Sequence, residues 1–201
     1  MSAITAITAQ STVGVSAVHM VPPDIVLAQV RAVLEDIGVD AVKVGMLGSA
    51  EVTLAVAQVL DELPAGTPVV VDPVMVAESG AKLLAPDAQQ ALVAEILPRA
   101  TVLTPNLPEA RVLAGQESAS QADEDAEAEA LARAVLTLGA RIVVLTGGHR
   151  ARATDLFLDS AGDGAIVAID GERYPDGAAH GSGCTHSSVL AAQLALGRRQ
   201  A

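Results

Sequence analysis

The sequence predicts an α/β fold in which a mostly parallel central sheet lies between layers of helices, a three-layer arrangement. Short apolar segments rich in Val, Ile and Thr alternate with segments of helical periodicity along most of the 201-residue chain. These short segments are apolar on both faces, as in strands that helices cover on both sides. No linker rich in Pro, Gly or Ser interrupts this order, and we therefore expect residues 1–201 to form a single domain.

The predicted strands and helices follow one another in a regular order. Strands are expected at 3–9, 41–47, 68–74, 101–104 and 141–146, and helices at 24–37, 49–63, 86–97, 107–113 and 124–138. Asp24 can cap the first of these helices, and Gly38 can end it.

Two parts of the chain depart from this order. After the fifth predicted strand, the segments 154–160 and 165–174 are separated by Ala-Gly-Asp-Gly, which predicts a β-hairpin. The segment 116–130 is acidic and rich in Ala, and it predicts a solvated loop followed by the exposed face of a helix.

Composition narrows the possible partners. The net charge of −12 repels polyanions, and Phe157 and Tyr174 are the only aromatic residues, so we expect no nucleic acid partner. Cys184 is the only cysteine and the amino end lacks a secretory signal, which favours a cytoplasmic location. Residues 1–23 carry no charged side chain, but Thr, Ser and Gln interrupt them, so they predict a buried strand and no membrane partner.

The segment HGSGCTHSS near the carboxyl end predicts the start of a helix. Gly181 and Gly183 flank Ser182 just before apolar residues at helical spacing, and Gly197 ends that stretch. Backbone N–H groups without partners point outward at a helix start, and glycines let a phosphate approach the main chain closely. The turn is therefore a candidate anion site with Cys184 as a candidate proton acceptor. The alternative is a tight turn followed by a buried structural cysteine.

Neither common nucleotide-binding loop is present. The turn has no lysine in the position that a G-x-x-x-x-G-K-[ST] loop requires, and the first predicted strand does not lead into a G-x-G-x-x-G turn. Phosphate binding is therefore expected late in the chain.

Five segments together resemble one known family. They are AVKVGMLG (41–48), VVVDPVMVAESGAKLL (69–84), TVLTPNLPEARVL (101–113), VVLTGGH (143–149) and HGSGCTHSS (180–188). Their order and spacing are similar to those of the bacterial hydroxymethylpyrimidine/phosphomethylpyrimidine kinases of thiamine biosynthesis, which have a ribokinase-like fold. The resemblance implies ATP-dependent, magnesium-dependent phosphorylation of 4-amino-5-hydroxymethyl-2-methylpyrimidine and then of its monophosphate.

The resemblance also implies roles for the residues that handle charge. Gly181, Ser182, Gly183 and Cys184 would form the anion hole for the transferring phosphoryl group, with Cys184 as the catalytic base. These roles fit a reaction that depends mainly on positioning and charge stabilisation.

Acidic and amide side chains match the family's metal and phosphate positions. Asp72 and Glu109 would hold magnesium and its waters, and Asn106 would lie near the phosphates. Each has a purely structural alternative: Asp72 can end a strand before Pro73, Glu109 can be a first-turn helix charge, and Asn106 can be a helix N-cap.

Other positions match the family's binding sites for the two substrates. Gln10 would pair with the pyrimidine, while Met46 and Val74 would sandwich its ring, although either apolar residue alone could be core. Thr146 and Gly148 would lie beside the nucleotide, with Gly147 next to them. His149, His180 and His186 are not spaced like a metal site and are expected to be ordinary loop or cap residues.

The chain departs from the family pattern in three respects. A Gly-rich segment is expected before the position of Ser2, and helices are expected beyond Gly197, so the chain resembles a family member truncated at both ends. Thr146 stands where relatives carry a lysine near the nucleotide phosphates, which predicts weaker nucleotide binding or slower turnover. A pyridoxal-type vitamin kinase and a non-catalytic remnant are the alternatives, and a homodimer is expected only by analogy.

Overall fold

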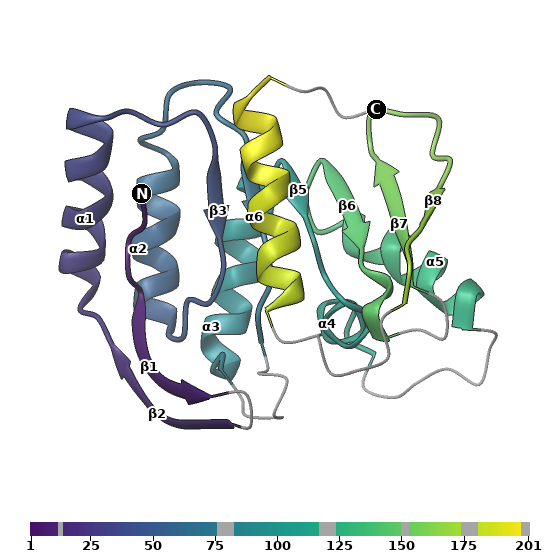
Figure 1. Cartoon of the computed structure of the whole chain (residues 1–201), viewed down its shortest axis with the longest axis horizontal. Coiled ribbons are helices and arrows are strands. Elements are labelled where there is room, and N and C mark those ends of the chain that lie inside the picture. Colours follow the sequence, from purple (N-terminus) through teal and green to yellow (C-terminus); the bar gives the residue numbers. More distant parts are fainter. Residues whose placement is uncertain (12–13, 76–82, 117–123, 150–152, 174–180, 198–201) are drawn as a thin grey trace.

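A computed structural model describes residues 1–11, 14–75, 83–116, 124–149, 153–173 and 181–197. Its centre is a six-stranded sheet in the order β3-β4-β5-β6-β7-β8 (Figure 1). The strands are β3 (Val42–Val44), β4 (Val69–Val71), β5 (Val102–Leu103), β6 (Ile142–Leu145), β7 (Thr154–Asp159) and β8 (Val167–Asp170). Strands β3 to β6 are parallel to one another, and β7 runs antiparallel to both of its neighbours, β6 and β8. The predicted mostly parallel sheet and the hairpin are therefore confirmed.

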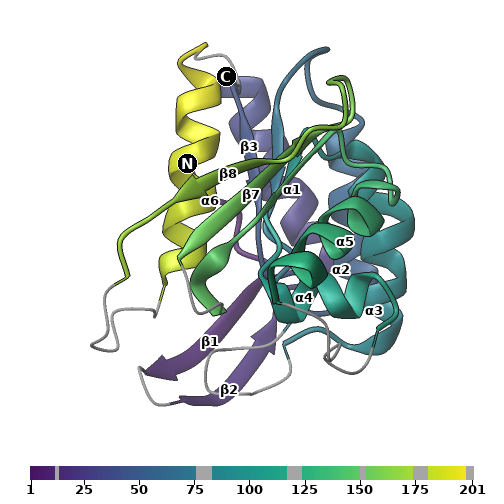
Figure 2. The same cartoon turned by 90° about the vertical axis from the view of Figure 1, so that its right-hand side faces the viewer.

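Helices cover both faces of this sheet (Figure 2). They are α1 (Pro23–Asp36), α2 (Ala50–Leu60), α3 (Pro86–Ala91), η1 (Leu92–Ile96), η2 (Leu97–Arg99), α4 (Leu107–Leu113), α5 (Glu124–Leu136), η3 (Gly147–His149) and α6 (Ser182–Ala195). Val71 and Leu103 pack in the cluster that holds α2, α4 and α5 residues, whereas Val70 and Val102 pack with Ala191 of α6. Alternate strand residues thus face opposite layers, which accounts for strands that are apolar throughout. None of the helices in the described segments has both the length and the apolar character of a membrane span.

Two local details differ from expectation. Helix α1 begins at Pro23 with Pro22 as its N-cap, so Asp24 lies inside the first turn and its side chain does not cap the helix. The single helix expected at 86–97 is instead α3 followed by a π-helical turn and a 3-10 turn. Gly38 does follow α1 with φ +82°, and its N–H donates to the carbonyl of Val33.

The prediction of a buried amino-terminal strand was wrong. Strand β1 (Ala6–Ser11) pairs antiparallel with β2 (Gly14–Met20) in a separate two-stranded sheet, and both strands are largely exposed. Apolar side chains such as Ile7 remain 60% exposed there. A segment without charges can form an exposed hairpin when polar residues alternate with the apolar ones.

The acidic segment was also only partly solvated. The Glu127 side chain in α5 is buried, and its two carboxylate oxygens accept hydrogen bonds from Arg111 of α4 at 2.8 and 2.9 Å. A bidentate arginine partner lets a carboxylate be buried, and this pair ties α4 to α5.

Candidate active site

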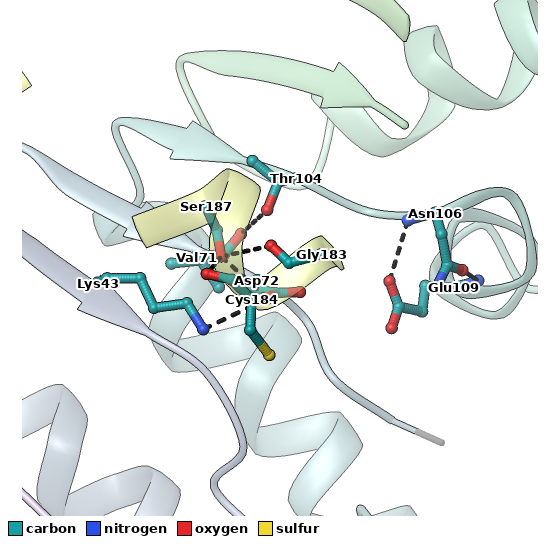
Figure 3. A network of polar contacts seen from close by, with 9 residues as sticks. All are labelled: Lys43, Val71, Asp72, Thr104, Asn106, Glu109, Gly183, Cys184 and Ser187. Carbon is teal, nitrogen blue, oxygen red and sulfur yellow. Dashed lines mark hydrogen bonds and ion pairs between the residues drawn. The ribbon is translucent and has the colours of Figure 1, made fainter. Parts of the chain in front are cut away.

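Asp72 lies directly after β4, at the carboxyl edge of the parallel strands, and is 5% exposed. Its N–H continues the sheet pairing by donating to the carbonyl of Val44 at 2.9 Å. Its Oδ2 accepts a hydrogen bond from Ser187 Oγ at 3.0 Å and lies 3.3 Å from Lys43 Nζ (Figure 3). The expected strand-end position of Asp72 is therefore observed, together with charged and polar partners from β3 and α6.

The first turn of α6 lies beside Asp72. Ser187 Oγ, which contacts Asp72, is also 2.9 Å from the carbonyl oxygen of Gly183 and 3.2 Å from that of Cys184. Gly181 precedes the helix with φ +79°, a left-handed conformation that favours glycine, and no side chain caps the helix start. The first N–H groups of α6 therefore have no partner within the helix.

Cys184 is exposed, and its thiol is free. It thus differs from the buried structural cysteine that the sequence left open as an alternative. The hydroxyl of Ser187 lies between the main chain of Cys184 and the Asp72 carboxylate, so the predicted anion-binding turn and the predicted metal-binding carboxylate are adjacent.

Glu109 and Asn106 form a capping box at the start of α4. Asn106 Oδ1 accepts from the N–H of Glu109 at 2.9 Å, and Glu109 Oε2 accepts from the N–H of Asn106 at 3.0 Å. The pKa of Glu109 is raised to about 7, chiefly because the carboxyl is buried and in smaller part because of the negative charge of Asp72, against the lowering effect of backbone hydrogen bonds. The N-cap role of Asn106 is present, and the two carboxylates are close enough to interact electrostatically.

The segment after β6 approaches the same region. Asn106 and Thr146 form an isolated parallel bridge, and the N–H of Thr146 donates to the carbonyl of Pro105 at 2.9 Å. Gly147 donates its N–H to Asp155 Oδ1 at 2.7 Å, and a side chain at 147 would overlap the main chain of Thr154, so only glycine fits. Gly148 is exposed, and no described atom lies within 4 Å of the position that a Cβ would take there.

The three predicted pyrimidine-binding residues come from separate places. Met46 and Val74 are half-buried, after β3 and after β4 respectively. Gln10 is exposed on β1, where it lines an open hollow of about 530 Å³ together with its hairpin neighbours. Among the described residues no hydrogen bond joins Gln10 to Met46, Val74 or the turn of α6. Figures 1 and 2 nevertheless place the hairpin at the same end of the molecule as α4 and the start of α6.

Histidines do not form a metal site in the described segments, where no three His, Cys, Asp or Glu side chains cluster. His186 Nε2 lies 4.0 Å from Asp155 Oδ2, and His180 falls outside the described residues.

Sequence reasoning missed Lys43 and Ser187 as members of this site. Lys43 was visible as a cation in an otherwise apolar strand, two positions before a glycine. Ser187 lies one helical turn after Gly183, a spacing that brings its hydroxyl back to the carbonyls of the first turn. Their common partner, Asp72, is distant in sequence from both.

Comparison with known proteins identifies relatives over nearly the whole chain. A family model described as phosphomethylpyrimidine kinase matches residues 1–201. The hydroxymethylpyrimidine/phosphomethylpyrimidine kinase of Rhizobium meliloti (strain 1021) is 47% identical over 198 residues, which cover 98% of this chain and 71% of that protein.

Solved structures agree with this match. The phosphomethylpyrimidine kinase of Clostridium difficile 630 has a TM-score of 0.81 and 36% identity, over 99% of this chain and 79% of that one. The ADP complex of Bacillus subtilis pyridoxal kinase has a TM-score of 0.84 and 33% identity, over 99% of this chain and 74% of that one. These similarities confirm the expected ribokinase-like fold. The chain therefore belongs to the phosphomethylpyrimidine kinase family.

Proposed function

We propose that this protein is a phosphotransferase that uses ATP to phosphorylate 4-amino-5-hydroxymethyl-2-methylpyrimidine and then its monophosphate, giving the diphosphate used in thiamine biosynthesis. Family membership supports the reaction type. The observation that carries the proposal is the junction at Ser187, which brings the uncapped start of α6, the exposed Cys184 and the carboxylate of Asp72 into one site.

The first turn of α6 is suited to hold the transferring group. The N–H groups of Ser182, Gly183 and Cys184 would stabilise negative charge that builds up on the phosphoryl oxygens, helped by the positive end of the helix dipole. In the transfer, the hydroxymethyl oxygen attacks the γ-phosphorus and the bond from that phosphorus to ADP breaks. The hydroxyl proton passes to the sulfur of Cys184, which accepts it as the thiolate and becomes the thiol; the residue is exposed and its sulfur is in no disulfide.

The acidic residues fit a magnesium ion. Asp72 and Glu109 offer hard oxygen ligands, and the charge of Asp72 disfavours ionisation of Glu109, a repulsion that a divalent cation would relieve. Asp72 and Glu109 would together hold Mg²⁺ and its waters, and the ion would offset the negative charge of the nucleotide phosphates. Asn106, Thr146 and Gly148 would border the nucleotide on this side.

The pyrimidine would lie between the hairpin and the sheet edge. Gln10 can donate to and accept from the ring nitrogen and amino group, while Met46 and Val74 supply apolar contact on the two ring faces. The exposed position of Gln10 leaves its amide available to a ligand.

Turnover with alternative substrates tests the proposal. The purified protein is supplied with ATP, Mg²⁺ and either hydroxymethylpyrimidine, its monophosphate or pyridoxal, and ADP release is followed. We expect the highest kcat/KM with the two pyrimidines. The similarity to Bacillus subtilis pyridoxal kinase makes pyridoxal the second candidate, and faster turnover of pyridoxal would overturn the assignment. No turnover with any of the three would indicate a non-catalytic remnant.

We also propose a cytoplasmic location, supported by the single cysteine, and a homodimer, supported by the exposed apolar residues of the β1–β2 hairpin. Light scattering at several protein concentrations measures the oligomeric state.

A further inference from the structure

Lys43 occupies an unusual position for a lysine. It lies in β3 between Val42 and Val44, and its side chain is only 21% exposed. Burying a cation in a sheet is costly unless a partner compensates it. The partner is Asp72, whose Oδ2 lies 3.3 Å from the ammonium nitrogen.

Gly45 makes room for this ammonium. Residues two apart in an extended segment point to the same face, and a Cβ built on Gly45 would lie 2.7 Å from Lys43 Nζ. The lysine side chain therefore lies over the glycine, and the absence of a side chain at Gly45 allows the ammonium group to take this position.

Lys43 and Ser187 hold the same oxygen of Asp72. Both contact Oδ2, whereas no described residue donates a hydrogen bond to Oδ1 (Figure 3). One carboxylate oxygen is thus fixed from β3 and from α6, and the other receives no hydrogen bond from the described residues. Because Ser187 also reaches the carbonyls of Gly183 and Cys184, the orientation of Asp72 is tied to the turn that would hold the phosphoryl group.

We propose that Lys43 is a positioning residue for phosphoryl transfer, which holds the Asp72 carboxylate so that Oδ1 faces the reacting group. This inference rests on the proposed kinase function. Lys43 orients Asp72 and does not bind the pyrimidine, so loss of the lysine reduces kcat more than it changes KM.

Three variants test this role. Lys43→Met removes the charge, Lys43→Arg retains it, and Gly45→Ala leaves the charge but displaces the ammonium. The control is Arg31→Met, which removes a cation from the surface ion pair between Arg31 of α1 and Glu62, a residue just after α2. For each protein kcat, KM for both substrates and Tm are measured, and binding of Mg²⁺-ADP is measured by calorimetric titration without the pyrimidine.

For Lys43→Met we expect kcat to fall by about tenfold or more, with both KM values and the Mg²⁺-ADP affinity within about threefold of wild type. Gly45→Ala lowers kcat by about threefold although the lysine is still present, Lys43→Arg recovers part of the lost rate, and Arg31→Met behaves as wild type.

Two results would overturn the role of Lys43 in an active wild-type enzyme. One is an unchanged kcat in Lys43→Met. The other is a parallel loss of kcat, substrate affinity, Mg²⁺-ADP binding and Tm, which indicates a contribution to folding alone. A wild-type protein without turnover on any substrate would instead remove the proposed function, and with it the reaction that Lys43 serves.

Discussion

The edge of the central sheet and the β1–β2 hairpin hold their parts of the site in different ways. Asp72 is 5% exposed and contacts side chains from β3 and α6. Gln10 is exposed on a hairpin that is tied to the domain at its base, where Thr5 Oγ1 donates to the carbonyl of Met46 at 2.7 Å. The buried scaffold thus places the groups that handle charge, and the exposed hairpin presents the group expected to recognise the ring.

The largest expected difference between these regions is in stability. Leu103→Ala in β5, at a fully buried position, should lower the free energy of unfolding by about 3–5 kcal/mol, since it leaves a cavity. Ile7→Ala in the hairpin, at a position 60% exposed, should change it by less than about 0.5 kcal/mol. Urea denaturation measures both, and equal losses would show that the hairpin belongs to the same cooperative core.

Glu109→Gln tests how the raised pKa of the Glu109 carboxyl affects stability. Because the pKa of Glu109 is raised from 4.5 to about 7, the folded protein binds this proton more tightly than the unfolded chain. Its stabilising contribution is fully present below pH 4.5 and is lost as pH rises through about 7, a change of about 3 kcal/mol.

Urea denaturation without metal at pH 4.5 and pH 8 measures this contribution. Glutamine keeps the acceptor for the Asn106 N–H but cannot ionise. The free energy of unfolding of the variant, relative to that of wild type, should therefore rise by about 3 kcal/mol between pH 4.5 and pH 8. A constant difference between the two proteins would contradict the raised pKa.

Asp72→Asn should lower kcat by about 100-fold, equivalent to about 2.7 kcal/mol, since it removes a metal-binding charge while preserving shape. The matched control is Asp61→Asn, in an exposed pair with Arg99, which should leave kcat unchanged and have little effect on stability. Steady-state kinetics with the pyrimidine measures both, and an active Asp72→Asn would remove Asp72 from the chemistry.

Gln10→Ala should raise KM for the pyrimidine by about fivefold, which corresponds to the free energy that one hydrogen bond contributes, about 1 kcal/mol. The kcat should remain within about twofold of wild type. Tm should not change, because the side chain is exposed. An unaltered KM would mean that the hairpin does not contact the ring.

Thr146→Lys is expected to have the smallest effect, a rise in turnover of about threefold, because a cation is restored near the nucleotide phosphates. Kinetics at varied ATP concentration tests it, and unchanged kinetics would show that the missing charge does not limit the rate.

Local pattern was sufficient to predict the central sheet, because β3, β4 and β5 are each a short apolar run followed by a helical segment, and β6 is a short apolar run followed by the hairpin. It did not predict β2, since the uncharged amino-terminal segment is equally compatible with a buried strand and with an exposed hairpin. The start of α6 could be predicted from Gly181 and Gly183. The contacts of Asp72 with Lys43 and Ser187 could not, because they depend on which distant segments the fold brings together.

The hydrogen bond from Ser187 to Asp72 joins residues 115 positions apart. The strands of the central sheet, by contrast, are neighbours in the same order as along the chain, so each can be added to one already formed. Loop-closure entropy disfavours contacts between distant residues, so we expect the docking of α6 to be a late step of folding. During refolding, sheet formation should therefore precede the recovery of catalytic activity.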